Sequence, residues 1–101
     1  MIDQIRKKIN QHKYEFSKHA LDQSIIRSIS IRDFEEAVIH SSEIIEDYPM
    51  DKYGPSCLIL CFTIAGRALH VVCTHPEREL LKVITIYEPD PLQWVRNNVR
   101  R

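Results

Sequence analysis

The chain has little of several features that would narrow its function. It contains two glycines and three cysteines, and its 14 basic and 14 acidic residues leave no net charge. The cysteines, Cys57, Cys61 and Cys73, are an odd number without C-x-x-C spacing, which predicts a reduced, cytoplasmic protein and not a disulfide framework. Most nucleic-acid-binding proteins carry a positive excess, because phosphate contacts supply much of their affinity. The zero net charge therefore weighs against that class.

Long hydrophobic runs are also missing. The longest, residues 57–65, is interrupted by Thr63 and is much shorter than the roughly 20 residues that a membrane helix needs. The residues at the start have no apolar run of the kind found in secretory signals. A chain of 101 residues that is 44% hydrophobic and 28% charged has the composition of one globular domain. We therefore expect a single domain over 1–101, in the cytoplasm and without membrane contact.

The hydrophobic spacing predicts helices first and strands afterwards. Helices are expected from the N-terminus to near His12, over 18–27, and behind a capping box that begins at Ser30. Residues 14–16 are either a short strand or an extended lead-in. Asp90 and Pro91 are typical of a helix start and predict a terminal helix over 92–99. Strands are expected over 42–48, 56–64, 67–74 and 80–88. The predicted fold is α+β, with N-terminal helices packed on a curled antiparallel sheet of about four strands and a C-terminal helix.

The register of the last three strands decides which side chains share a face. If residues 65–66 form the turn, or the centre of a four-residue loop, Cys61 pairs with His70. With residues 75–80 as the next loop, Thr85 lies opposite His70 and Tyr87 opposite Ala68. One face then packs on the helices, and it carries Leu58, Leu60, Phe62, Ile64, Leu69, Val71, Ile84 and Ile86. The other face gathers Cys61, Thr63, His70, Thr85 and Tyr87.

The polar residues on these strands suggest chemistry. A buried sheet gains no stability from the imidazole of His70, the hydroxyl of Thr85 or the phenol of Tyr87 unless each finds a partner. On the predicted second helix, His19, Gln23 and Arg27 recur every four residues and form one polar stripe. Cleaving RNA through its own 2′-hydroxyl needs a base, an acid and a cation near the phosphate. Histidine suits the first two roles near neutral pH, and arginine suits the third.

Each of these residues also has an ordinary structural interpretation. A single sheet histidine such as His70 is more often a partly buried residue with satisfied hydrogen bonds. Arg67 beside the turn has Glu88 as a natural ion-pair partner, and the stripe on the second helix has the pattern of a solvated face. Because no two histidines on one element have metal-ligand spacing, the sequence predicts no metal site and no cofactor.

Several short motifs together resemble a known family. They are Phe16-Ser-Lys-His19-Ala20-Leu21, Arg27-Ser-Ile29-Ser30, Ile44-Ile45-Glu-Asp-Tyr48-Pro49, Arg67-Ala-Leu-His70-Val71-Val72, Ile84-Thr85-Ile-Tyr87-Glu-Pro89-Asp-Pro91 and Trp94. In this order they resemble the domain of unknown function 4258 family, over the stretch from Tyr14 to Trp94. That family is similar to the RelE/ParE-like ribonuclease toxins, whose helices precede a curled antiparallel sheet. Its members often resemble the toxin half of a toxin–antitoxin pair.

The resemblance implies a function and assigns residues to it. The protein would be a metal-independent endoribonuclease with RNA as substrate and an antitoxin protein as partner, and a homodimer is left open. His70 and His19 would share the acid–base work with Tyr87 and Thr85 beside them, and Arg27, Arg67 and Gln23 would bind the substrate. One departure stands at Gln23-Ser24, where the family commonly has Arg-Met, so one phosphate-binding charge is missing. The alternative is a gyrase-targeting or non-catalytic binding protein with the same fold.

Overall fold

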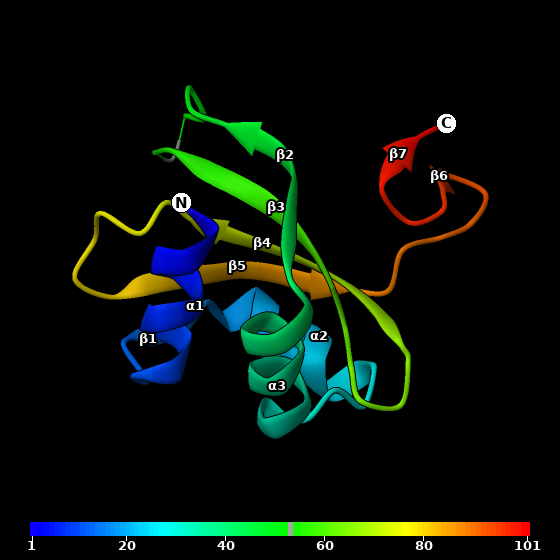
Figure 1. Ribbon diagram of the computed structural model, residues 1–101, viewed down its shortest axis with the longest axis horizontal. Coiled ribbons are helices and arrows are strands. Elements are labelled where there is room, and N and C mark those ends of the chain that lie inside the picture. The colour runs from blue at the N-terminus through cyan, green and yellow to red at the C-terminus, as the bar shows by residue number, and fades with distance from the viewer. Residues whose placement is uncertain (53) are drawn as a thin grey trace.

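Three helices come first in the chain, and nearly all of the strands follow them (Figure 1). The computed structural model describes residues 1–52 and 54–101. The helices are α1 (Ile2–Asn10), α2 (Lys18–Ile26) and α3 (Ile31–Ser41), and none of these is long and apolar enough to cross a membrane. The strands are β1 (Tyr14–Phe16), β2 (Glu43–Tyr48), β3 (Ser56–Phe62), β4 (Ala68–Thr74), β5 (Leu81–Tyr87), β6 (Trp94–Val95) and β7 (Val99–Arg100). The α+β class and the helix-first order are as predicted.

The main sheet has five strands in the order β1-β5-β4-β3-β2. Strands β2 to β5 form an antiparallel meander, while the short β1 adds to the far edge parallel to β5, with Tyr14 opposite Leu81. The prediction of about four antiparallel strands therefore missed one, because residues 14–16 do join the sheet. Figure 1 shows α2 and α3 on one side of the sheet and the β6–β7 hairpin beyond its other side.

The core lies between the helices and one face of the sheet. Phe34 of α3 and Ile5 and Ile9 of α1 are fully buried there. The sheet contributes Cys57, Ile59, Cys61, Leu69, Val71, Cys73, Leu81, Val83 and Ile86. The predicted core face is therefore right for β4 and for Ile86. It is wrong for β3, where Leu58 and Leu60 point away from the helices, and for Ile84, which lies outside the core.

The cause is a loop of odd length between β3 and β4. Thr63 and Arg67 close it through a backbone hydrogen bond, so three residues form the loop, and the last of them, Gly66, has φ +88°. A turn followed by a left-handed glycine is typical of three-residue hairpin loops. The register consequently pairs Leu60 with His70, where a two- or four-residue loop would have placed Cys61. One residue of slip moves the whole of β3 to the other face.

The predicted register between β4 and β5 is wrong because the pairing contains a β-bulge. The register shifts between Val72 and Cys73, and the Thr74 hydroxyl accepts a hydrogen bond from the Lys82 backbone N–H at 3.0 Å. His70 consequently lies opposite Tyr87, and Val72 opposite Thr85. The predicted partners were wrong, but His70, Thr85 and Tyr87 still share the face turned away from the helices.

The predicted terminal helix over 92–99 is also wrong. The Asp90 carboxylate does accept from the Leu92 N–H at 2.9 Å, as an N-cap would, yet only one turn follows. Arg96 and Asn97 then adopt φ of +50° and +67°, and the Asn98 N–H donates to the Val95 carbonyl. Two successive positive φ values make the tight turn that joins hairpin strands, a conformation that asparagine tolerates well. The chain therefore forms the β6–β7 hairpin instead of a helix.

Candidate functional site

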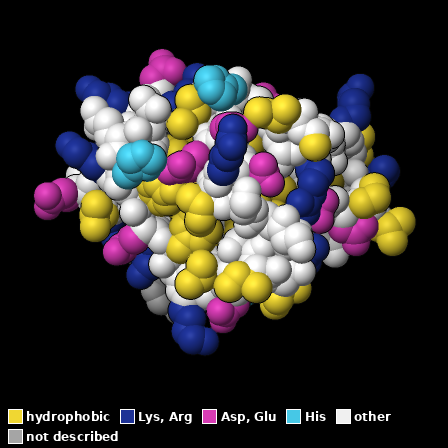
Figure 2. Space-filling model, turned by 90° about the horizontal axis from the view of Figure 1, so that it is seen from below, with side chains coloured by type: hydrophobic (Ala, Val, Ile, Leu, Met, Phe, Trp, Pro, Cys, Tyr) yellow, Lys and Arg dark blue, Asp and Glu magenta, His cyan; other side chains and the backbone are white. Residues whose placement is uncertain are grey.

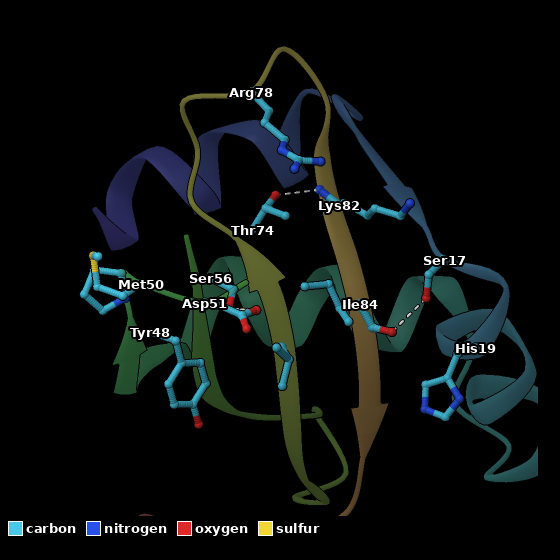
Figure 3. Close-up of a pocket in the computed structure, with 12 residues that line it drawn as sticks. Ser17, His19, Tyr48, Met50, Asp51, Ser56, Thr74, Arg78, Lys82 and Ile84 are labelled. Carbon is cyan, nitrogen blue, oxygen red and sulfur yellow. Dashed lines mark hydrogen bonds between the residues drawn. The ribbon is translucent and has the colours of Figure 1, made fainter. Parts of the chain in front are cut away.

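An open groove of about 1010 Å³ crosses the sheet face that lies away from the helices (Figure 3). Its floor is formed by side chains of β3, β4 and β5, and its walls come from the start of α2, the end of β2 and the connection between β4 and β5. The lining residues are Ser17, His19, Tyr48, Pro49, Met50, Asp51, Ser56, Val72, Thr74, Arg78, Lys82 and Ile84. Segments that are far apart in the sequence therefore meet in one depression, whose surface combines apolar and polar side chains.

His19 is placed in this groove by the first turn of α2. Ser17 caps the helix, since its hydroxyl oxygen accepts from the Ala20 N–H at 3.0 Å, and the same hydroxyl donates to the Ile84 carbonyl at 2.7 Å. These bonds fix the helix start to β5, so the exposed His19 ring lies beside Ile84 (Figure 3). In the described part of the chain, no side chain or backbone group lies within hydrogen-bond distance of the His19 ring. The His19 side chain is therefore a groove-lining group whose nitrogens are free of partners among the described residues.

The groove is cationic at one end and acidic at the other. Lys82 and Arg78 approach it from β5 and from the preceding connection, and Figure 3 shows Arg78 above Thr74 and Lys82 beside it. At the β2 side, the Asp51 carboxylate accepts from the Ser56 hydroxyl at 3.3 Å. Glu15 of β1 is the register partner of Lys82, so one carboxylate also lies beyond the cationic end. A phosphate would therefore find its charge partners near Lys82, on the same side of the groove as His19.

His70 does not line the groove, although it lies on the same sheet face. Its ring is 0% exposed, with Nε2 2.6 Å from the Asn97 carbonyl oxygen and Nδ1 3.2 Å from the Tyr87 hydroxyl. Because a carbonyl can only accept, Nε2 carries the proton and Nδ1 accepts from Tyr87. Trp94 meets the ring edge-on, with centroids 4.5 Å apart. Burial lowers the pKa of His70, so the neutral imidazole fits this site.

The hairpin over His70 is anchored to β2 by charge. Arg100 donates two hydrogen bonds to the Glu46 carboxylate, at 2.8 and 3.0 Å, and the Tyr48 hydroxyl donates to the same group. The bond from Arg100 lowers the pKa of Glu46. The Arg100 guanidinium also lies 4.7 Å from the centre of the Trp94 ring. Tyr48, which shares Glu46 with Arg100, also lines the groove.

Arg67 is engaged in contacts within the protein. Its guanidinium donates to the backbone carbonyls of Arg27 and Ser28 at 2.8 and 3.1 Å, and it forms an ion pair with Glu88 at 3.1 Å. These bonds join the β3–β4 loop and the end of β5 to the C-terminal end of α2. The ion pair with Glu88 that the sequence offered as a structural role is therefore present.

The structure brings together some of the predicted site residues and separates others. His70 and Tyr87 are in contact, and Thr85 follows on the same face. His19 lies in the groove, whereas Gln23, Arg27 and Arg67 do not line it. Sequence reasoning missed the groove residues Ser17, Tyr48, Arg78 and Lys82. A signal existed for Lys82, which is the only charged residue in β5.

The remaining groups that could bind a metal or act as thiols are the cysteines and the acidic and histidine side chains. Among residues 1–52 and 54–101, no group of three His, Cys, Asp or Glu side chains is arranged to hold a metal ion. The three cysteines are free thiols buried in the core. Burial raises the pKa of Cys61 to about 12, so this thiol stays protonated at neutral pH.

Comparison with known proteins gives one finding. No curated protein and no solved structure matches the chain significantly. The profile of the family described as domain of unknown function DUF4258 matches residues 16–88, which run from the last residue of β1 through α2, α3 and the strands β2 to β5. The matched stretch holds every residue that lines the groove, and it ends before the β6–β7 hairpin. The chain thus belongs to the DUF4258 family.

Proposed function

We propose that the protein is a metal-independent endoribonuclease, the toxin of a toxin–antitoxin pair, and that it cleaves RNA in the groove. The observation that carries this proposal is the His19 ring, which faces the groove without a protein partner on the same side as Lys82. An imidazole in an open groove near a lysine ammonium offers a proton acceptor close to a phosphate-binding cation. The helix-first order and the antiparallel meander support a RelE/ParE-like fold.

The chemistry needs only groups that this groove contains. His19 takes the proton from the ribose 2′-hydroxyl, and the resulting oxygen attacks the adjacent phosphorus. Lys82 neutralises the charge that develops on the phosphorane oxygens. The bond from phosphorus to the 5′-oxygen breaks, and this oxygen leaves with a proton from the Lys82 ammonium or from water. The upstream fragment keeps a 2′,3′-cyclic phosphate, and the downstream fragment begins with a 5′-hydroxyl.

An antitoxin is the partner that this proposal requires. Such a protein would act by covering the groove in the cytoplasm, and α2 offers it an adjoining surface. Leu21, Ile25 and Ile26 of α2 are 45%, 69% and 72% exposed, next to Gln23 and Arg27 on the same helix. Figure 2, which views the helical side, shows apolar side chains gathered among charges of both signs. Apolar anchors with a charged rim are the usual composition of a protein-binding surface.

A non-catalytic binding protein is the second candidate function, and one observation favours it. His70 and Arg67, two of the residues to which the family resemblance assigns chemistry, use their polar atoms in bonds within the protein. A groove without a second accessible histidine still binds a phosphate-containing ligand. The two candidates differ in whether the bound RNA is cut.

The decisive experiment is RNA cleavage in the presence of EDTA. Purified wild-type protein is incubated with single-stranded RNA, and the fragment ends are identified by mass spectrometry. We expect 2′,3′-cyclic phosphates, and no cleavage of RNA in which the 2′-oxygen is methylated. His19→Ala should lower the cleavage rate by about a hundredfold or more, the usual contribution of a positioned acid or base. His40→Ala is the matched control, because His40 is exposed on α3, on the other side of the sheet.

Two results would contradict the proposal. Intact RNA at high protein concentration would leave the binding protein as the better candidate. If the His19 and His40 variants lose activity equally, or if both keep it, His19 has no catalytic role.

A further inference from the structure

A second depression, of about 270 Å³, lies across the β4–β5 connection from the groove. It is lined by Gln4, Lys7, Lys8 and Gln11 of α1 and the following turn, with Lys13 and Pro76. Pro76 belongs to the same connection, residues 75–80, that carries Arg78 into the groove. One short loop therefore separates a depression lined by three lysines from the cationic end of the groove.

Contacts hold the two depressions in a fixed relation. The Lys8 ammonium donates to the backbone carbonyls of Arg78 and Glu79 at 2.5 and 2.7 Å, which fastens α1 to the connection. The Leu81 N–H donates to the Lys13 carbonyl at 3.1 Å. Lys13 therefore lies beside the start of β5, one residue before Lys82 enters the groove.

The lysines in the second depression form no ion pairs with the residues that the structure describes. Elsewhere, five cationic side chains are in ion pairs with carboxylates: Arg6 with Asp3, Lys18 with Asp22, Arg32 with Glu36, Arg67 with Glu88, and Arg100 with Glu46. In the part of the chain that the structure describes, no carboxylate lies within ion-pair distance of Lys7, Lys8 or Lys13. Three ammonium groups without a carboxylate partner among the described residues thus lie close together in a chain of zero net charge.

We propose that a single RNA strand bound in the groove continues over residues 75–80 and that Lys7 and Lys13 contact its phosphates there. This inference rests on the proposed function, because it extends the path of the same substrate. Ammonium groups and glutamine amides are hydrogen-bond donors, which suits phosphate oxygens. No aromatic side chain lines the depression among the described residues, so the surface holds the backbone and not stacked bases.

The test is the salt dependence of RNA binding. The probe is a 2′-O-methylated RNA oligonucleotide, which binds but lacks the hydroxyl needed for cleavage. Each phosphate contact on a single strand contributes about 0.7 to the slope of log K against log salt concentration, so Lys7→Gln/Lys13→Gln should lower this slope by about 1.4. The control is Lys18→Gln/Arg32→Gln, which changes the net charge equally on α2 and α3. It should leave the slope close to the wild-type value.

A short substrate separates this inference from the proposed function. A dinucleoside monophosphate fills the groove but does not reach α1, so the Lys7→Gln/Lys13→Gln variant should cleave it at the wild-type rate. An unchanged slope in that variant, or an equal fall in the control, would overturn the path over α1 and leave the nuclease intact. If the wild-type protein binds no RNA, both the function and the path are wrong.

Discussion

We expect His70 to contribute mainly to the stability of the fold and not to RNA cleavage, and the His70→Ala variant tests this. The ring is 0% exposed and makes two hydrogen bonds and an edge-on contact with Trp94. Truncation leaves the Asn97 carbonyl and the Tyr87 hydroxyl without their partner, at about 1–2 kcal/mol each, and opens a cavity of similar cost. We expect a loss of roughly 3–5 kcal/mol in the free energy of unfolding, which is a large part of the ~5–15 kcal/mol typical of a domain.

Urea unfolding followed by fluorescence measures this loss directly. Trp94 is the only tryptophan in the chain and touches the substituted ring, so its emission reports on the β6–β7 hairpin itself. His70→Gln is the matched variant, because its amide N–H can still donate to the Asn97 carbonyl. It should lose about half as much stability as His70→Ala. Cleavage of RNA per folded molecule should stay close to wild type in both variants.

The same residue predicts a pH dependence with a definite sign. Burial lowers the pKa of His70 in the folded protein below its unfolded value of about 6.5. The unfolded chain therefore binds the proton more readily, and the stability that His70 contributes is complete above about pH 6.5 and declines as the pH falls below it. The difference in unfolding free energy between wild type and His70→Gln should shrink on acidification. The reasoning is refuted if His70→Ala unfolds like the wild type but has lost its nuclease activity.

Three further substitutions test the contacts that hold α2 and α3 in place. Ser17→Ala removes the cap of α2 and its bond to Ile84, so it should cost about 1–2 kcal/mol and also slow RNA cleavage, because His19 moves with the helix start. Ser30→Ala removes the cap of α3 and should cost a similar amount without slowing cleavage of the remaining folded protein. Arg67→Ala should cost about 1–2 kcal/mol, mainly through the lost bonds to the end of α2, and high salt should weaken only the Glu88 part of it. Thermal unfolding with and without salt measures both terms, and a wild-type melting temperature for Arg67→Ala would contradict the structural role.

Local sequence signals predicted the elements of the fold well and their registration poorly. The helices over 18–27 and after Ser30 follow from caps and hydrophobic spacing, and the structure confirms both. Register depends on loop length, and residues 63–67 allow loops of two, three or four residues with the same strands on either side. Only Gly66 at positive φ, closing a three-residue loop, decides the outcome. The β-bulge at Val72 cannot be predicted from the hydrophobic periodicity of the strands.

The groove was harder to predict than the fold because it has no contiguous motif. Its walls come from the start of α2, the end of β2 and the connection before β5, and only the sheet order brings them together. His19 was identified because it belongs to a polar stripe on α2, yet the residues of that stripe meet different surroundings. His19 turns into the groove at one end of the helix, while the backbone carbonyl of Arg27 binds Arg67 at the other. Helical spacing predicts which residues share a face of a helix, but it does not predict which part of the protein or solvent that face contacts.

The failed prediction of a helix at the end of the chain has a cause in the sheet. A histidine on a buried strand requires partners for both ring nitrogens, and one of them comes from 27 residues further along, at the Asn97 carbonyl. In a helix over 92–99 the carbonyl of residue 97 would point along the helix axis toward its C-terminal end, as all helix carbonyls do. A hairpin with a positive-φ turn leaves the carbonyl available and points it at His70. The polar residue that suggested catalysis thus favours the hairpin, and the hairpin in turn satisfies the polar residue. A buried histidine in a strand should accordingly prompt a search for distant backbone partners before a catalytic role is assigned.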